Sequence, residues 1–261
     1  MRTCRIYALA RFFLGVLAFG AVPTFIQAQE KEDIRDSVYQ LSDKTSSENK
    51  LFYVKDVETW KTWAGTDTFT QTYNNGTLVF GNDKAEKGSG TIHIGKGGLG
   101  YINARFNAKD IYLTGKLITG YDDTRGGADI VFKATNNFNI EGFEAQYWKS
   151  GTQGSNLKIY SDQAIDIKDS KFLFWRTSDA DGARDFILNA KNGITMSNTT
   201  ISTQDSWDFG GKIYYTIDAG AGDLQATSTN ITQHHSTLYS NSSKIKAGGN
   251  ISFDKQSTFN M

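Results

Sequence analysis

A short pattern recurs along this chain at a nearly constant interval. In each copy an apolar and a polar residue precede Ala or Ser, a turn rich in Gly, Asn or Asp follows, and two apolar residues then stand two positions apart. Successive copies lie 26, 27, 29, 29 and 28 residues apart. The small residues that mark the copies are Ala108, Ala134, Ser161, Ala190, Ala219 and Ala247. A near-constant period of this length is typical of a solenoid, in which each repeat packs against its two neighbours.

The spacing inside each copy indicates the kind of solenoid. Apolar residues at every second position are typical of strands, whereas a helix needs a spacing of three and four. A third apolar position, such as Phe172 or Ile201, follows a Ser/Thr step. We therefore predict an all-β fold, a parallel β-helix with three short strands and three corners in each coil of 26 to 29 residues.

Each strand of such a helix pairs with the coil above and the coil below, so equivalent residues should stack in ladders. The first predicted ladder contains Phe138, Ile165, Ile194, Leu224 and Ile251. The second contains Ile140, Ile167, Met196, Ala226 and Phe253. The lack of proline in residues 29–261 agrees with this fold, because proline removes a hydrogen-bond donor from an interior strand.

The first 28 residues are predicted to be a secretory signal peptide. Three arginines precede an apolar run at 12–26, and Ala28 precedes the expected cleavage point. This run is short for a membrane span, and an uncleaved anchor is the alternative. Removal of the segment takes away the sole cysteine and leaves 25 basic against 28 acidic side chains, a net charge of −3. Such a balance gives no electrostatic reason to expect nucleic acid as a partner.

The remaining chain is predicted to have three parts. Residues 29–50 read as a polar leader, in which a short helix at Ile34–Leu41 is an option. Residues 51–105 are expected to form an amino-terminal β cap region, where Asn75–Gly76 between alternating runs indicates a hairpin. Residues 106–261 are expected to form the coils of the β-helix, open at the carboxy-terminal end.

The repeat pauses at 146–156, 175–184 and 203–212, in stretches rich in Gly, Ser and Asp. These stretches are predicted to bulge from one side, and insertions on one face of a solenoid are often its contact surface. The candidate surface-contact residues in or beside them are Trp148, Trp175 and Trp207. Exposed aromatic rings bind sugars or protein partners, and coverage of the core beneath a loop is the alternative role.

No cofactor, metal site or catalytic site is predicted. The acidic stretch Asp179–Gly182 lacks the further ligands of a calcium loop. Gly220–Ala226 is a single copy of a glycine-aspartate pattern that binds calcium only in tandem. His234 and His235 are adjacent and would point to opposite faces of a strand.

Some β-helices are polysaccharide lyases or glycoside hydrolases, which need carboxylates that converge from successive coils. Aligned on the repeat, one column of outward positions holds Asp162, Lys191, Gly220 and Gly248. Another column holds Asp166, Thr195, Gln225 and Ser252. Neither column is acidic throughout, so an enzyme is not expected, although a secreted β-helix enzyme that acts on polysaccharide is the alternative function.

Two segments carry a resemblance to a known family. "ARFNAKDIYLTGKL" at Ala104–Leu117 and "ADIVFKATNNFNI" at Ala128–Ile140 resemble the amino-terminal passenger region of the vacuolating cytotoxin autotransporters. The core of the likeness is "FNAKDI" at Phe106–Ile111, and the likeness extends over Trp60–Phe174. It implies a right-handed β-helix that a Gram-negative bacterium exports, that is secreted or displayed at the outer membrane, and that contacts a host-cell surface protein or glycan. It also implies a tendency to form homo-oligomers, and end-to-end stacking of the coils is expected as an option beside this.

The chain departs from this family in two ways. The cytotoxins carry a long apolar, glycine-repeat segment after the signal, whereas residues 29–50 here are too charged to insert in a membrane. Pore formation is therefore not expected, and no functional residue of the family transfers to this chain. The outer-membrane translocator barrel is also absent from this sequence. Because the last repeat at Ile245–Phe259 lacks the polar cap of natural solenoids, we expect a truncated passenger.

Overall fold

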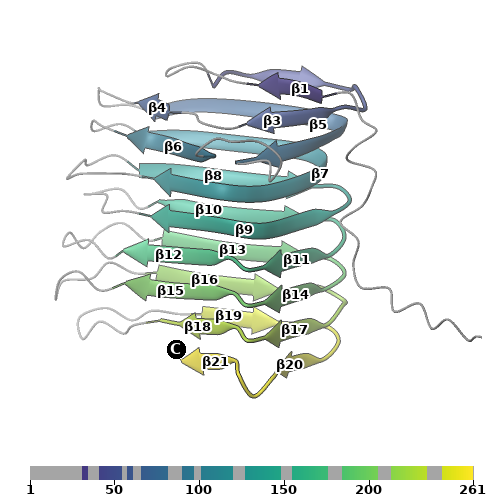
Figure 1. Ribbon diagram of the computed structural model, residues 1–261, viewed down its shortest axis with the longest axis vertical. Coiled ribbons are helices and arrows are strands. Elements are labelled where there is room, and N and C mark those ends of the chain that lie inside the picture. Colours follow the sequence, from purple (N-terminus) through teal and green to yellow (C-terminus); the bar gives the residue numbers. More distant parts are fainter. Residues whose placement is uncertain are drawn as a thin grey trace, which may run out of the picture.

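The computed structural model shows a right-handed parallel β-helix (Figure 1). All regular structure among the described residues is strand. The described residues are 31–34, 41–54, 58–60, 66–81, 90–96, 101–119, 127–147, 155–175, 184–204, 213–233 and 243–260. The predicted fold class is confirmed.

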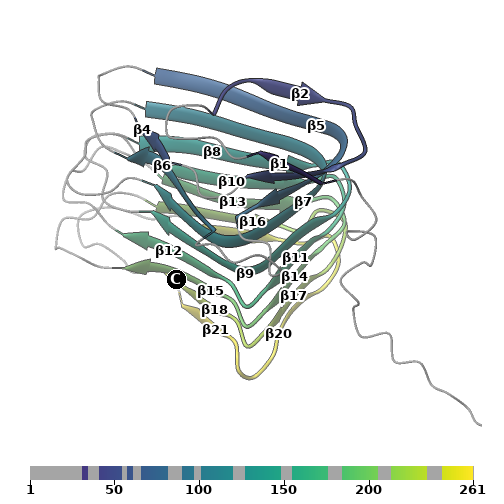
Figure 2. The same ribbon diagram turned by 45° about the horizontal axis from the view of Figure 1, so that its top comes forward.

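One coil of the helix consists of three strands that follow one another around the cross-section. They are β10 (Asn156–Ser161), β11 (Ile165–Lys168) and β12 (Lys171–Trp175). The next coil repeats them as β13 (Arg184–Ala190), β14 (Ile194–Ser197) and β15 (Thr200–Gln204). Each strand pairs in parallel with its counterpart, so the first, second and third strands build three separate faces. Figure 2 shows the second and third strands of successive coils nested around a common corner.

The same arrangement continues toward the carboxy terminus in two more coils. These are β16 (Ile213–Asp218), β17 (Leu224–Thr227), β18 (Asn230–Thr232), β19 (Ser243–Lys246), β20 (Ile251–Phe253) and β21 (Thr258–Asn260). Toward the amino terminus the strands are β1 (Lys31–Ile34), β2 (Lys44–Ser46), β3 (Leu51–Val54), β4 (Glu58–Trp60), β5 (Thr66–Phe80), β6 (Thr91–Lys96), β7 (Tyr101–Thr119), β8 (Gly127–Ala134) and β9 (Phe138–Tyr147). Here β5, β7 and β9 run through corners that separate two strands in later coils.

The predicted ladders are present, and all their members are buried except Ile251 and Phe253 in the last coil, which were also expected to point into the core. Ile165 pairs with Phe138 on one side and with Ile194 on the other, and the second ladder follows two residues later. The small residues lie where predicted, because Ser161 pairs with Ala134 and with Ala190, and all three are buried. Aromatic rings add to the packing near the amino-terminal half, where Phe106 and Phe132 stack with centroids 5.1 Å apart. The period read from the sequence is therefore the circumference of a coil.

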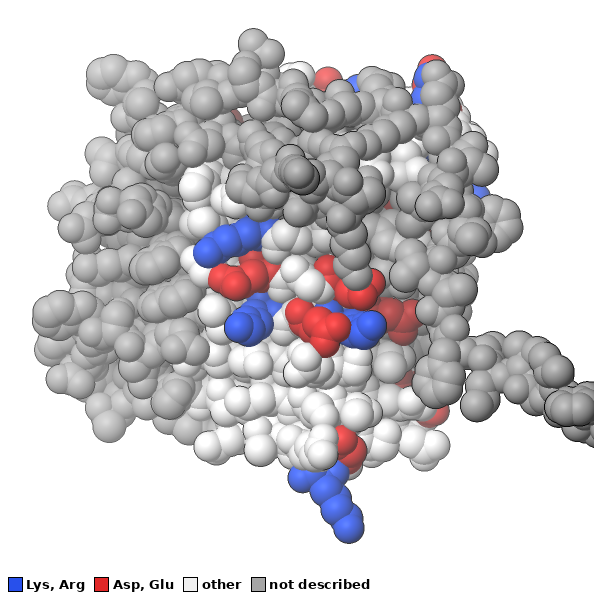
Figure 3. Space-filling view, viewed as in Figure 1, with Lys and Arg blue, Asp and Glu red and all other residues white. Residues whose placement is uncertain are grey.

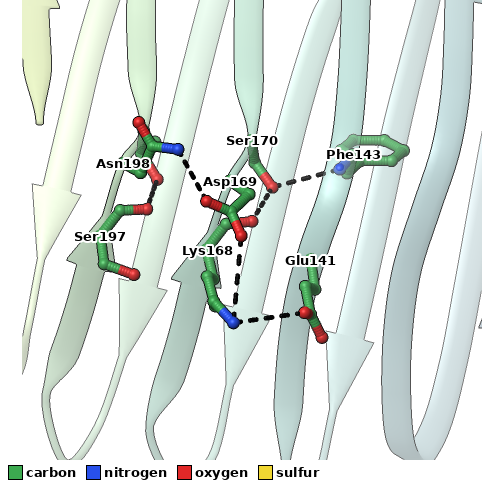
Figure 4. A network of polar contacts seen from close by, with 8 residues as sticks. Glu141, Phe143, Lys168, Asp169, Ser170, Ser197 and Asn198 are labelled. Atoms are coloured by element: carbon green, nitrogen blue, oxygen red, sulfur yellow. Dashed lines mark hydrogen bonds and ion pairs between the residues drawn. The ribbon is translucent and has the colours of Figure 1, made fainter.

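The corner between the second and third strands uses an unusual backbone conformation. Asp169, Asn198 and Ser228 occupy equivalent positions with φ of 50°, 47° and 48°, in the left-handed region that non-glycine residues rarely adopt. Asn198 Nδ2 donates to Asp169 Oδ1 at 2.7 Å, so two of these side chains link neighbouring coils (Figure 4). Asn and Asp tolerate this conformation better than other residues, which explains their use at a tight turn.

A buried hydroxyl follows each of these turns. Ser170 Oγ donates to the Lys168 carbonyl at 2.7 Å and accepts from the Phe143 amide at 3.2 Å, as Figure 4 shows. Thr199 and Thr229 donate in the same way to the carbonyl two residues before them, each at 3.0 Å. The hydroxyl ladder satisfies backbone groups that the corner removes from the strand ladder, because a buried polar group without a partner is costly.

The hairpin predicted at Asn75–Gly76 is wrong. β5 passes through this point and pairs in parallel with β2 before it, with β3 after it, and with β7 on both sides. A Cβ on Gly76 would lie 2.4 Å from the Phe52 ring, so the glycine allows a close approach between coils. Asn75 Nδ2 donates to the Ser47 carbonyl at 2.8 Å. The pair marks a corner of the coil, which has the same local residue preference as a hairpin turn.

The parallel pairing between coils also extends upstream of residue 106, where the coils of the β-helix were expected to begin. β5 pairs with β7 from Thr66 to Phe80, with a register shift between Tyr73 and Thr77, within the segment expected to be a separate cap region. β2 pairs with β5 inside the segment expected to be a polar leader. The helix proposed at 34–41 lies outside the described residues except at its ends, where Ile34 belongs to strand β1 and Leu41 is buried.

Candidate functional site

The structure does not describe the side chains of the three tryptophans that are predicted to make surface contacts. Trp148 and Trp207 lie outside the described residues. Trp175 is the last residue of β12, where its backbone pairs with Gln204 of the next coil. The described strands on either side of the three predicted insertions do stack in register, so the chain leaves and re-enters the helix at the same corner of each coil. The contact role of the tryptophans stays a prediction.

The structure describes some of the residues that were considered from the sequence for metal binding or acid–base catalysis, and leaves out others. Asp179–Gly182 and the His234–His235 pair lie outside the described residues. Asp223, in the glycine-aspartate stretch, uses Oδ1 to accept the Asn250 amide at 2.7 Å. Among the described residues there is no group of three or more His, Cys, Asp or Glu side chains that is arranged to hold a metal ion.

The two predicted outward columns exist. Lys191 Nζ lies 2.7 Å from Asp162 Oδ1, so the acid of the first column forms an ion pair with the next coil. This hydrogen bond holds the pKa of Asp162 below its ordinary value. Asp166 pairs with Thr195, and Thr195 with Gln225, which confirms the second column. In neither column does a carboxylate face a second carboxylate from the neighbouring coil.

A polar cluster on the outer surface of the first-strand face is the candidate site. Strand alternation turns Tyr101 and Arg105 of β7, Asp129 of β8, and Asn156 and Lys158 of β10 outward, and we call these five residues the Asp129 cluster. Register brings them together, because Asn103, Asp129 and Asn156 are paired neighbours across three coils. Residues up to 57 positions apart in the sequence thus share one surface.

Asp129 is the centre of this cluster and is only 7% exposed. Lys158 Nζ lies 2.9 Å from Asp129 Oδ1, and Arg105 Nη2 lies 3.4 Å from Oδ2. Each oxygen of the carboxylate therefore faces one cation, from the coil below and from the coil above. A buried carboxylate without such partners would be strongly destabilising, so the two cations are what allow an acid at this position.

Tyr101 lies at the edge of the cluster and is held in its neutral form. Burial, followed by the negative charges of Asp129 and Asp185, raises the pKa of Tyr101 to about 12. Asn156 Nδ2 donates to the Tyr101 hydroxyl at 3.5 Å, which opposes this rise. Asn156 is itself held by the Asp185 amide, which donates to Asn156 Oδ1 at 2.8 Å. Like an ordinary tyrosine, this phenol carries its proton at physiological pH, and it keeps the proton to a higher pH than usual.

A second charged surface lies on the face of the second and third strands. Figure 3 shows Lys and Arg side chains next to Asp and Glu side chains in the middle of this face. Lys116 Nζ lies 3.3 Å from Glu144 Oε1, and Lys168 Nζ lies 3.5 Å from Glu141 Oε1. These exposed pairs join neighbouring coils and contribute little to stability, about 0–1 kcal/mol each. Each of these pairs joins one positive and one negative side chain, so the two pairs together carry no net charge.

The Asp129 cluster was not predicted from the sequence, although the repeat contains the signal for it. The same alignment that stacks Ala108, Ala134 and Ser161 puts Arg105 and Lys158 in one outward column, next to the column of Asp129. Comparing each column with its neighbour, instead of inspecting each column by itself, would have revealed the ion pairs of Asp129 with Arg105 and Lys158. Chemically, the cluster offers fixed donors and acceptors on a rigid sheet, an arrangement that suits contact with a polar partner.

Comparison with known proteins gives one match. A family model described as putative vacuolating cytotoxin matches residues 97–155. The matched segment contains β7, β8 and β9, and with them Tyr101, Arg105 and Asp129. The resemblance predicted over Trp60–Phe174 is thus confirmed for these coils. No curated protein matches the chain, and no solved structure does. In the described part of the chain, no helix has the length and apolar character to cross a membrane.

Proposed function

We propose that this chain, whose coils β7–β9 are similar to the putative vacuolating cytotoxins, is an exported toxin-like β-helix that binds a protein or glycan on the surface of a host cell. The observation that carries the proposal is the overlap of the family match with consecutive coils of one continuous β-helix. The match includes two whole turns of the solenoid and is therefore more than a shared short motif.

The Asp129 cluster supports a contact role for the first-strand face. It combines a neutral phenol, an amide and two cations around one carboxylate, on strands that are paired on both sides. Polar partners such as glycans and protein surfaces are recognised through fixed hydrogen-bonding groups of this kind, with little ordering cost upon binding. The tryptophans at 148, 175 and 207 remain additional candidate contacts.

Export is proposed from the amino-terminal segment. The arginines followed by an apolar run at 12–26 and by Ala28 fit a secretory signal, and the protein then acts outside the cell or at the outer membrane of a Gram-negative bacterium. Expression in such a host, followed by amino-terminal sequencing of the extracytoplasmic protein, tests this step. A chain that begins at Gln29 is expected, and retention of the whole chain in the cytoplasm would contradict export.

We further propose that the protein does not form pores. Residues 29–50 are highly charged. Part of this segment forms a strand of the β-helix. Strand β2 pairs with β5, and Asp43 Oδ1 accepts the Thr70 amide at 2.7 Å. Conductance across planar lipid bilayers should remain at the level of buffer when the protein is added, and discrete channel openings would disprove this part of the proposal.

Binding to cultured host cells is the central test. Fluorescently labelled protein should bind in a saturable way and be displaced by unlabelled protein. Tyr101→Phe combined with Lys158→Gln should remove most of the binding, because both changes alter the Asp129 cluster. Thr195→Ser on the exposed second-strand face is the matched control and should bind normally. Failure of the wild-type protein to bind, together with release of reducing sugars from a polysaccharide panel, would favour the alternative enzyme.

A further inference from the structure

A column of polar side chains crosses five successive coils on the outer surface of the first-strand face, whose strands are stacked along the long axis of the molecule (Figure 1). Register places one residue of each coil in this column, and we call it the polar column. Its members are Thr68, Asn103, Asp129, Asn156 and Asp185. Each member carries a hydroxyl, an amide or a carboxylate, the side-chain groups that form hydrogen bonds with hydroxyl groups of a ligand.

The spacing of the polar column suits one class of ligand. The column runs across the strands, and neighbouring strands of a sheet lie about 4.8 Å apart. Its hydrogen-bonding groups therefore repeat once in each coil, at nearly the length that one sugar adds to an extended, β-linked glycan. Such a glycan, laid along the helix axis, would stay in step with every coil that it crosses. An extended peptide advances about 3.4 Å per residue and would fall out of step within a few coils.

The charges of the polar column and of the column beside it cancel. The column beside it holds Thr70, Arg105, Val131, Lys158 and Ile187. Two cations of this column, Arg105 and Lys158, thus stand against the two carboxylates of Asp129 and Asp185, and both cations are held by Asp129. A surface without net charge attracts neither an anionic nor a cationic ligand. It is complementary to a neutral ligand that is recognised through hydrogen bonds.

The side chains of the polar column hold one another only through long hydrogen bonds. Asn103 Nδ2 donates to Thr68 Oγ1 at 3.3 Å, and Asn156 Nδ2 donates to the Tyr101 hydroxyl at 3.5 Å. Both distances exceed the usual range for such bonds, about 2.7–3.2 Å. Thr68 is exposed, and the Arg105 side chain is 44% exposed. Hydroxyl groups of a ligand can therefore reach this surface and replace long hydrogen bonds with shorter ones.

We propose that the polar column binds a neutral, linear, β-linked glycan along the helix axis, with one sugar facing each coil. This inference rests on the surface-binding function proposed above and names the class of ligand for the same face. Asn103 and Asn156 donate to the sugar hydroxyls, and Arg105 and Lys158 do so from the column beside them. Asp129 acts through the two cations that it positions. Because the donors lie on strands that are paired on both sides, little order has to be gained upon binding.

The length dependence of binding tests this inference. Isothermal titration calorimetry of the purified chain uses cello-oligosaccharides and chito-oligosaccharides, from the disaccharide to the hexasaccharide. Each added sugar should tighten binding by roughly two- to tenfold, the effect of one net hydrogen bond. The gain should stop at the pentasaccharide, because the polar column has members in five coils. Absence of binding at every length, or an affinity that does not change with length, would overturn the inference.

A pair of substitutions locates the ligand on the face. Asn103→Ala combined with Asn156→Ala should weaken binding of the pentasaccharide by roughly tenfold or more, the effect of two lost hydrogen bonds. Asn189→Ala is the matched control, because Asn189 points outward on the same face but lies outside the polar column. Circular dichroism should show the same β signal for all three proteins. An equal loss of affinity in Asn189→Ala would place the ligand elsewhere and contradict the proposed column.

The binding of labelled protein to host cells separates this inference from the proposed function. Cell binding without oligosaccharide binding would overturn the glycan inference and leave a protein as the partner on the host cell. Oligosaccharide binding without cell binding would support the glycan inference and contradict the proposed host contact. A sulfated oligosaccharide of the same length should bind no more tightly than the neutral one. Tighter binding of the sulfated ligand would contradict the neutral class of ligand inferred from the balanced charges.

Discussion

The last two coils have nearly the same residue pattern and very different environments. Leu224 of β17 and Ile251 of β20 are partners in one ladder, as are Ile231 and Phe259. The first member of each pair is completely buried, whereas Ile251 and Phe259 are 48% and 43% exposed. The pattern sets the direction in which a side chain points, and the next coil provides its burial. Position in the stack, and not residue type, therefore decides how much each apolar residue contributes to stability.

The largest difference should appear when the two environments are tested with the same substitution. Ile194→Ala, in a fully enclosed coil, should lower the free energy of unfolding by about 2–4 kcal/mol, because it leaves a cavity between neighbouring coils. Ile251→Ala should cost less than about 1 kcal/mol by the same reasoning, since half of the side chain already contacts water. Urea denaturation monitored by circular dichroism measures both losses. Equal losses would mean that the last coil is covered in solution.

Glycine substitutions should show a smaller difference in stability between an enclosed coil and the last coil. The glycines concerned lie at the corner between the first and second strands of a coil. Gly220 has φ of 59°, and a Cβ there would lie 2.3 Å from the Lys191 carbonyl oxygen. Gly220→Ala should therefore destabilise the protein by about 1–3 kcal/mol, the usual cost of backbone strain. At Gly248, in the last coil, the Cβ would be 2.8 Å from the Gly220 oxygen. Gly248→Ala should cost less, because the last coil can shift away. Thermal melts of the two variants compare the corners, and a larger loss at Gly248 would contradict this view.

Acid should loosen the last coil before the others. The hydrogen bond from Lys246 holds the pKa of Asp218 below its ordinary value, with help from the Gly220 amide and the charges of Lys246 and Lys244. A depressed pKa means that this contact stabilises the fold above about pH 4 and is lost as the pH falls through the lower, folded value. The exposed pair is worth less than about 1 kcal/mol.

Hydrogen exchange of the β19 amides reports this loss directly. Protection of β19 should decrease between neutral and acidic pH more than protection of β13, whose neighbours lie on both sides. In Asp218→Asn, the pH dependence of β19 protection should weaken. An unchanged pH dependence in this variant would assign the loosening to another group.

The smallest effect is expected at the second corner. Ser228 has φ of 48° in a position that holds Asn198 in the coil before it. Asparagine adopts this conformation more readily than serine, so Ser228→Asn should raise the free energy of unfolding by about 0.5 kcal/mol. Asn198→Ser is the reciprocal change and should lower it by a similar amount. The midpoints of urea denaturation provide the test, and a loss in both variants would show that the Ser228 hydroxyl bond to Gln256 matters more than backbone strain.

The outcome at Asn75–Gly76 shows the limit of local signals. The pair favours a tight turn wherever it occurs, and both a hairpin and a β-helix corner contain such a turn. What separates them is the partner of each flanking strand, which here is β2, β3 or β7 and not the other arm of β5. These partners lie 26 to 35 residues away, so no local window contains the information.

The candidate site shows the same limit for function. Tyr101, Arg105, Asp129, Asn156 and Lys158 are unremarkable outward residues on three separate strands. They become a cluster because register aligns three coils, and the ion pairs of the buried Asp129 with the more exposed Lys158 and Arg105 then arise between neighbouring columns. The tryptophans singled out by composition were easier to notice, but their side chains are not described.

The amino-acid order alone is enough to specify the coil length, the two predicted ladders and the small residues at the corners, because these features repeat with a nearly constant period and each repeat packs on a copy of itself. The stacked arrangement adds what a single repeat cannot contain. It determines which strand each segment pairs with, which outward side chains become neighbours, and how much of each apolar side chain is buried. The physical reason is that pairing and burial depend on the adjacent coil, which lies one full turn away along the chain.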